Sequence, residues 1–275
     1  MFAGANIERF LIYPKQFLKK IYLYLCNLIY LFMLLAIDVG NTQIKWAVFE
    51  QNMLLNKDII AYFDWKNDLN KVLKKYSKIQ ICVVSSVGNL KEKDFLFLTR
   101  NLKVFFISKN IKFPFENKYE STNTLGIDRM VLSAGAVLKF PKQNRLVIDA
   151  GTCITYDFID INNNYYGGAI SPGIRLRYES LNNYTAKLPL LSKENPKNLI
   201  GNSTAESIHS GIINGISFEI NGFINSILDR NDNFIIILTG GDADFLAKRL
   251  KNTIFANSNF LLESLNQLFQ YNQND

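Results

Sequence analysis

Two short turns of the same type hold the residues of this chain that could do chemistry. Asp38-Val39-Gly40-Asn41-Thr42 and, 111 positions later, Asp149-Ala150-Gly151-Thr152 each follow an apolar run and precede an alternating segment. Each turn places an aspartate at a strand end, then a glycine that permits a tight turn, then a hydroxyl residue. Glycine lets backbone N–H groups approach phosphate oxygens, the hydroxyl donates a hydrogen bond, and the carboxylate can orient a hydrated cation. One copy would also suit an ordinary hairpin, but the pair, one in each half, indicates a phosphate site.

The composition favours a two-domain cytoplasmic protein over a nucleic-acid-binding one. The chain has 275 residues and is 48% hydrophobic, which is enough for two domains of common size. Its formal net charge of +7 comes from scattered basic residues, with no basic stripe interleaved with aromatics, so no nucleic-acid partner is expected. Its 3 cysteines lie far apart and form no metal-ligand pair, which fits a reduced compartment.

The first 32 residues are expected to form a leader outside the fold. Residues 21–37 are an almost uncharged apolar run after Lys19 and Lys20, similar to a signal peptide or a short membrane anchor. However, residues 33–37 are the strand that delivers Asp38 to its turn, and the remaining stretch, 21–32, is too short to span a bilayer. Met33 is therefore the expected start of the folded chain, and no membrane association is expected.

The expected elements follow the same order in both halves. The first half is expected to contain strands 33–39, 42–49 and 53–62, helix 67–77, strand 79–84, a short helix 92–100, strand 102–107 and helix 127–140. The second half is expected to contain strands 145–149, 152–159 and 165–170, helices 173–187 and 203–229, strand 234–238 and a further helix. Three strands followed by alternating helix and strand, run twice, predict an α/β fold of two like-folded domains, 33–140 and 141–275. A cleft is expected between the two acidic turns.

Five blocks of residues resemble one known family. They are 38–45, Tyr119 with Leu125-Gly126-Ile127-Asp128-Arg129, 149–152, 168–173 and 201–204. Two domains with paired phosphate turns are similar to the ribonuclease H-like, actin-like ATPase domains of the acetate and sugar kinase, Hsp70 and actin superfamily. Within it, the sequence resembles the type III pantothenate kinases from Met33 almost to the C-terminus. The resemblance implies ATP-dependent phosphorylation of pantothenate to 4′-phosphopantothenate, the first step of coenzyme A biosynthesis.

The resemblance also implies the residues that bind ATP and cations. The ATP contacts would be Asp38, Val39, Gly40, Asn41, Thr42, Gln43, Ile44 and Lys45 from the first turn, with Thr152 from the second. Asp38 would orient Mg²⁺ and Lys45 would offer a compact positive charge, whereas an exposed strand lysine is the alternative interpretation. Asp149 would bind a monovalent cation, K⁺ or NH₄⁺; by its chemistry alone it could equally be a magnesium carboxylate.

The acceptor side follows from the same resemblance. Tyr119, Gly126, Ile127, Asp128, Arg129 and Thr204 would contact pantothenate. Asp128 would be the general base that accepts the proton of the attacking primary hydroxyl; its alternative role is an acid in the first turn of a helix. Arg129 suits either the substrate carboxylate or charge on the transferring phosphoryl group, and Thr204 also suits a helix start. Thr239-Gly240-Gly241 would lie under the nucleotide base or ribose, although a plain strand-to-helix turn would also explain this segment.

Other functions share this scaffold: a non-catalytic regulator of the transcription-accessory type, and a kinase for another small hydroxyl compound or a phosphohydrolase of the same superfamily. The presence of Asp38, Lys45, Asp128 and Asp149 argues against a decayed site, and the block from Tyr119 to Arg129 selects the acceptor.

A homodimer is also expected. Helices 173–187 and 203–229 carry more apolar residues than a monomer needs to cover, and related enzymes pair through this half. The residues are Ile174, Leu176, Leu181, Ile212, Ile213, Ile216 and Phe218.

Overall fold

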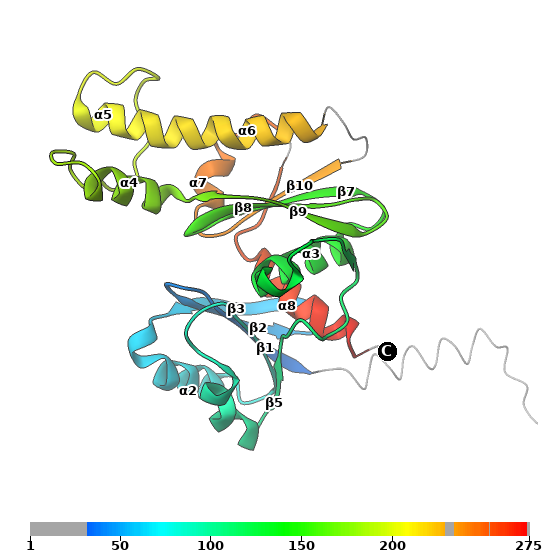
Figure 1. Cartoon of the computed structure of the whole chain (residues 1–275). Coiled ribbons are helices and arrows are strands. Elements are labelled where there is room, and N and C mark those ends of the chain that lie inside the picture. The colour runs from blue at the N-terminus through cyan, green and yellow to red at the C-terminus, as the bar shows by residue number, and fades with distance from the viewer. Residues whose placement is uncertain (1–31, 229–233, 253, 274–275) are drawn as a thin grey trace, which may run out of the picture.

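The computed structural model describes residues 32–228, 234–252 and 254–273, which form two β-sheets separated by a pair of helices (Figure 1). The expected leader lies outside the described residues except for Phe32. This residue is buried, and its ring meets that of Phe269 edge-on with 5.8 Å between centroids, so it belongs to the core. No helix within the described ranges has both the length and the apolar character that a membrane span needs.

The first sheet has the strand order β3-β2-β1-β4-β5. Its strands are β1 (Met33–Val39), β2 (Ile44–Glu50), β3 (Met53–Ile60), β4 (Ile79–Ser86) and β5 (Lys103–Phe106). β1 to β3 form an antiparallel meander, while β4 and β5 run parallel to β1. The 3₁₀ turn η1 (Tyr62–Asp64), α2 (Trp65–Lys75) and the 3₁₀ helix η2 (Glu92–Arg100) cover the outer face, where Trp65, Leu69 and Phe95 are buried.

The second sheet repeats this topology. Its order is β11-β10-β7-β8-β9-β6, with β7 (Asn144–Ala150), β8 (Cys153–Ile159) and β9 (Asn164–Pro172) antiparallel, and β10 (Phe234–Thr239) and β11 (Phe255–Ala256) parallel to β7. The outer face is covered by α4 (Ile174–Asn183), α7 (Ala243–Ala247) and a long helix that runs from α5 (Thr204–His209) through the π-helical segment η4 (Ser210–Asn214) into α6 (Gly215–Leu228). The predicted pair of like-folded α/β halves is confirmed.

The sheets do not divide at residue 140. β6 (Glu116–Asn117), which precedes that boundary, pairs with β9 of the second sheet. α8 (Phe260–Tyr271), a helix that the sequence analysis did not anticipate, packs against β1, β2 and β4 of the first sheet. The chain therefore crosses between the two sheets more often than the expected domains, 33–140 and 141–275, imply.

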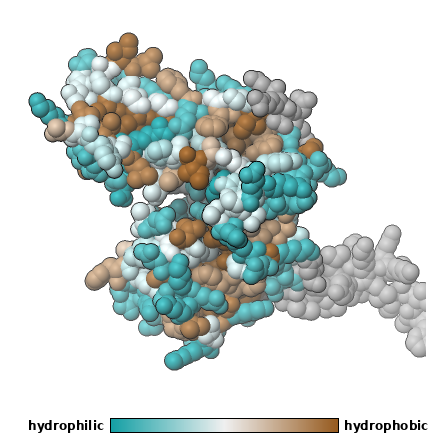
Figure 2. All heavy atoms as spheres, viewed as in Figure 1, coloured by the Kyte–Doolittle hydropathy of each residue, from teal (hydrophilic) through white to brown (hydrophobic). Residues whose placement is uncertain are grey.

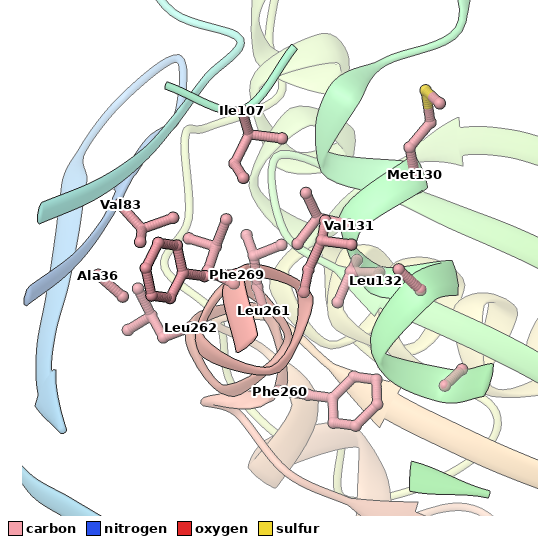
Figure 3. Close-up of a cluster of buried hydrophobic side chains, with 14 of the residues drawn as sticks. Ala36, Val83, Ile107, Met130, Val131, Leu132, Phe260, Leu261, Leu262 and Phe269 are labelled. Carbon is pink, nitrogen blue, oxygen red and sulfur yellow. The ribbon is translucent and has the colours of Figure 1, made fainter. Parts of the chain in front are cut away.

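α3 (Ile127–Lys139) and α8 lie side by side between the sheets and share one large core with both of them (Figure 3). Ala36 and Val83 reach this core from the first sheet, Val131 from α3 and Phe269 from α8. The inner faces of the two sheets are thus held toward each other, and Figure 2 shows a notch between the two lobes at the left of the view.

Candidate active site

Two rows of residues in register cross the inner faces of the sheets. The first is Ser85, Asp38, Lys45 and Ile59, on β4, β1, β2 and β3; the second is Thr239, Asp149, Thr155 and Ile170, on β10, β7, β8 and β9. Each row thus holds one of the two acidic residues at the end of its sheet's first strand, and Lys45 lies directly opposite Asp38.

Strand alternation shows which way the rows face. In β1, Leu34 and Ala36 pack between the sheets while Leu35 and Ile37 pack against the outer helices, so Asp38 has the parity of the inner face. In β7, Val147 packs inward, and Asp149 shares its parity. The two aspartates therefore face the same space between the sheets.

The first turn is tight and contributes mostly backbone. The N–H of Gly40 donates to the carbonyl of Gln43 at 3.1 Å, and the Tyr62 hydroxyl donates to the carbonyl of Gly40. The side chains of Val39 and Ile44 are buried on the outer face, so these two predicted ATP contacts can offer only main-chain groups. Asn41, Thr42 and Gln43 are exposed.

The second turn has a matching arrangement. The N–H of Gly151 donates to Cys153 at 2.9 Å, and the exposed Thr152 accepts from the N–H of Gly173 at 3.0 Å through its carbonyl. Gly240 has a φ of +96°, and a Cβ there would clash with the carbonyl of Ala150 and the carboxylate of Asp149. Only glycine fits, so the predicted Thr239-Gly240-Gly241 turn packs directly against the second acidic turn.

The charges of Asp38, Asp128, Asp149 and Lys45 affect one another's ionisation, and these four residues are termed the acidic cluster. Burial raises the pKa of Asp38 to about 7; nearby Lys45 opposes this, while the charges of Asp128 and Asp149 add to it. Burial likewise raises the pKa of Asp149 to about 6, again opposed by Lys45 and increased by Asp128. Lys45 is therefore part of the cluster rather than an isolated surface lysine.

The donor set suits a hydrated Mg²⁺ that arrives with a phosphate. Asp38 is only 5% exposed, and its Oδ1 has no hydrogen-bond partner. Among the described residues there is no group of three or more histidine, cysteine or acidic side chains that could hold a metal ion. Magnesium commonly uses one or two protein carboxylates and takes its other ligands from water and phosphate, so a single available carboxylate fits it.

Asp128 lies in the first turn of α3 and is partly exposed. The N–H of Arg129 donates to its Oδ1 at 2.8 Å, which is the bond expected of a helix-start acid. Burial raises the pKa of Asp128, the bond from Arg129 opposes that shift, and the nearby charge of Asp157 increases it. The side chain thus combines a helix-start contact with the raised pKa of a stronger base.

Arg129 has a partner that the sequence analysis missed. Its Nε and Nη2 donate to Asp157 Oδ1 at 2.9 and 2.6 Å, and the Tyr165 hydroxyl donates to the same oxygen at 2.6 Å. All three side chains are buried, so this ion pair is shielded from solvent. Two of the three guanidinium nitrogens are engaged internally. Asp157 could have been found from the sequence by the alternation of side chains along its strand, because Asp157 faces the inner side of the sheet as Thr155 does.

Tyr119 is packed against this ion pair. The guanidinium of Arg129 lies 5.6 Å from the centre of the Tyr119 ring. Gly167, with a φ of +91°, leaves the space for that ring, because a Cβ at this position would come within 2.5 Å of it. Three distant segments thus pack together at this point: the loop after β6 with Tyr119, helix α3 with Arg129 and strand β8 with Asp157.

A lysine holds the loop between Tyr119 and α3. Lys109 Nζ donates to the carbonyls of Thr122 and Asn123 at 2.9 and 2.7 Å. These residues form the 3₁₀ turn η3 (Thr122–Thr124), which Thr124 closes by donating its N–H to Ser121 at 3.0 Å. Lys109 therefore fixes the approach to Gly126 and Asp128.

Thr204 lies in a different place from the other predicted residues. It begins α5, where Ser203 caps the helix by accepting from the N–H of Glu206 at 3.2 Å. With α4 residues such as Arg177 and Leu181 it lines a groove of ≈ 920 Å³ that includes none of the other predicted site residues. The structure does not group Thr204 with the acidic cluster.

The apolar residues that predicted a homodimer mostly fill the core. Ile174, Ile212, Ile213 and Ile216 are buried against the second sheet. Phe218, by contrast, is 62% exposed on α6. Most of these apolar residues therefore cover the second sheet and are not an excess that a partner subunit must bury, so the premise of the predicted homodimer was wrong for them.

Similarity to known proteins identifies the family of this chain. A family model described as type III pantothenate kinase matches residues 34–226, more than half of the chain. The chain belongs to the type III pantothenate kinase family. It is 59% identical over 239 residues to the type III pantothenate kinase of Flavobacterium psychrophilum, an alignment that covers 87% of this chain and 99% of that protein. The type III pantothenate kinase of Bacteroides fragilis is 35% identical over 242 residues, covering 86% of this chain and 98% of the relative.

Solved structures agree on the fold. A conserved putative Baf family transcriptional activator from Campylobacter jejuni superposes with a TM-score of 0.57 at 21% identity, covering 88% of this chain and 100% of that one. A putative N-acetylmannosamine kinase from Listeria monocytogenes superposes with a TM-score of 0.52 at 14% identity, covering 88% and 99%. At these identities the likeness concerns the architecture alone.

Proposed function

We propose that this type III pantothenate kinase family member transfers the γ-phosphoryl group of ATP to the primary hydroxyl of pantothenate, the first step of coenzyme A biosynthesis. The observation that supports this most directly is the coupled group of Asp38, Lys45, Asp128 and Asp149 in the space between the two sheets. It combines what phosphoryl transfer needs: a carboxylate for a cation, a positive charge for phosphate and a base for the acceptor.

The phosphates of ATP would lie between the two turns. The main-chain N–H groups of Asn41 and Thr42 and the hydroxyl of Thr152 are the proposed donors, because the N–H of Gly40 is used within the turn, and Lys45 adds a positive charge. Bound Mg²⁺ would neutralise charge on the phosphates, and Asp38 would hold it through its unpartnered carboxylate oxygen. These assignments give each turn a separate task in binding one nucleotide.

The nucleoside would bind beside the second turn. A cavity of ≈ 420 Å³ there is lined by Ile174, Tyr178, Leu191, Lys193 and Asp242, among others. The N–H of Asp242 donates to the carbonyl of Ala150 at 3.0 Å, so the cavity adjoins the acidic turn. Its mixture of apolar side chains with charged and polar groups suits a base and ribose.

The acceptor hydroxyl would be deprotonated by Asp128. Its burial-raised pKa makes the ionised carboxylate a stronger base, which helps it take a proton as the hydroxyl attacks phosphorus. Tyr119, Gly126 and the backbone of Ile127 would shape the acceptor pocket. Arg129, anchored on Asp157, would present its remaining guanidinium edge to the substrate carboxylate or to phosphoryl charge.

Asp149 would bind the monovalent cation, K⁺ or NH₄⁺. With a pKa of about 6 it is mostly ionised at pH 7.5 and can hold a cation beside the phosphates. Replacing K⁺ by Na⁺ at constant ionic strength should weaken ATP use, and Asp149→Asn should reduce the difference between the two salts. Equal rates in K⁺ and Na⁺ would contradict this role.

The enzyme would act as a cytoplasmic homodimer. Support for pairing through the second half now comes from exposed aromatic side chains on α6, Phe218 and the 36% exposed Phe223, together with the family resemblance.

Incubation of the purified chain with ATP and pantothenate, with mass detection of 4′-phosphopantothenate, tests the function directly. Well-folded protein that binds ATP but forms no product with Mg²⁺ and K⁺ would favour the regulator. Phosphorylation of other small hydroxyl compounds in preference to pantothenate would favour a different acceptor.

A further inference from the structure

Ser85 is a fully buried serine whose hydroxyl has no hydrogen-bond partner. It lies near the end of β4 with 0% exposure, and its Oγ makes no hydrogen bond within the described structure. Its neighbour Ser86 differs, because the Ser86 hydroxyl donates to the carbonyl of Leu90 at 2.6 Å. Buried polar atoms are usually paired, so an unpaired one beside a ligand site suggests a contact with the ligand.

The position of Ser85 places it beside Asp38. The two residues are parallel partners on β4 and β1. Val83 packs between the sheets whereas Val84 packs on the outer face, so Ser85 has the inward parity, as Asp38 does. Neighbouring strands lie about 4.8 Å apart, which leaves the two side chains adjacent. No hydrogen bond between them is present among the described contacts, and Asp38 Oδ1 is also unpartnered.

Two adjacent oxygens of this kind favour a ligand that donates hydrogen bonds. Water molecules around a divalent cation are donors and can bond to a carboxylate and to a hydroxyl at once. A phosphate oxygen is an acceptor and would be repelled by the ionised carboxylate. A cation with its water shell is therefore the better match to both side chains.

We propose that Ser85 is a further ligand-binding residue, whose Oγ hydrogen-bonds the water shell of the divalent cation held by Asp38. This inference rests on the proposed binding of Mg-ATP. The second sheet offers a parallel: Thr239 occupies the same place beside Asp149 that Ser85 occupies beside Asp38. A hydroxyl residue on the parallel neighbour of each acidic strand is thus a shared feature of the two halves.

The test compares Ser85→Ala with Ser133→Ala. Ser133, in the middle of α3, is also fully buried with an unpartnered hydroxyl but belongs to neither row, so the chemical change is matched. ATP binding is measured by calorimetry with Mg²⁺ and again with a chelator, without pantothenate. Ser85→Ala should weaken binding of Mg-ATP about 10-fold, as expected for one lost hydrogen bond in a charged site, and leave metal-free binding unchanged. Ser133→Ala should leave both unchanged.

Melting temperatures separate this role from a structural one. Removal of an unpaired buried hydroxyl should not lower stability, so both variants should melt at or above the wild-type temperature. Unchanged Mg-ATP affinity in Ser85→Ala would overturn the proposal, as would an equal loss with and without Mg²⁺, which would point to phosphate. Since binding is measured without pantothenate, a wrong acceptor assignment would leave this result intact.

Discussion

Burial makes ionisation unfavourable for the carboxyl groups of the acidic cluster, and Asp38 shows this most clearly. Its carboxyl is buried, its pKa is about 7 in the folded chain, and its ordinary value is 3.8. The folded state therefore binds a proton that the unfolded state has released. For such a group the free energy of unfolding falls as pH rises from about 4 to about 7. Above pH 7 the folded protein carries the full destabilisation from its ionised, buried carboxylate.

Asp38→Asn should remove this cost. The variant should be more stable than the wild type without nucleotide, with a difference that grows from pH 5 to pH 8 and reaches roughly 2–4 kcal/mol. It should also lose affinity for Mg-ATP. Thermal or urea unfolding of both proteins across this pH range is the measurement. A stability difference that does not change with pH would contradict the buried, proton-binding carboxyl.

Asp128→Asn should affect chemistry more than folding or nucleotide binding. Asparagine keeps the shape and the helix-start hydrogen bond but removes the proton acceptor, so turnover should fall roughly 10² to 10⁴-fold. ATP affinity and melting temperature should be nearly unchanged. Asp68→Asn is a matched control, because Asp68 is also an acid in the first turn of a helix, α2. Normal turnover in Asp128→Asn would reduce Asp128 to a helix-start acid.

At the scale of elements, the approach to the acceptor pocket depends on contacts between segments. The loop before α3 contains only a short 3₁₀ turn, and Lys109 ties two of its carbonyls to the segment that follows β5. The loop is otherwise exposed from Ser121 to Thr124. Its geometry therefore depends strongly on one side chain.

Lys109→Met should loosen this loop. Methionine keeps much of the side-chain length but cannot donate to the two carbonyls, so KM for pantothenate should rise about 3- to 10-fold while KM for ATP stays the same. Lys93→Met, at an exposed lysine of η2, serves as the control. Steady-state kinetics with each substrate varied in turn measure the effect. An equal change in both KM values would indicate a general loss of structure.

For the whole molecule, the exposed face of α6 is where pairing would occur. The long helix from α5 to α6 covers the outer face of the second sheet (Figure 1), and its buried isoleucines leave Phe218 pointing to solvent. A large exposed aromatic side chain on a long helix suits an interface.

Phe218→Ser should therefore weaken the dimer. The wild type should be a dimer by light scattering at micromolar concentration, and the variant should dissociate at concentrations at least about 10-fold higher. Leu96→Ser is the control, because Leu96 is 57% exposed on η2 in the other half. A monomeric wild type, or equal effects of the two changes, would refute pairing through α6.

Short-range patterns determined much of this protein. The two acidic turns, the repeated strand order and the inward parity of Asp38, Lys45 and Asp149 follow from local alternation and glycine placement, which act over a few residues. The family resemblance rested on five short blocks of sequence, two of which contain these turns, and it is confirmed.

Only the tertiary structure decided what depends on contacts between distant segments. The pairing of Arg129 with Asp157, the insertion of α8 between the sheets and the burial of the α4 and η4 isoleucines all join residues far apart in sequence. The raised pKa values of Asp38 and Asp149 have the same origin, because burial is set by every element around a side chain. Periodicity shows which face of an element is apolar, whereas the packed chain alone determines which other element covers that face.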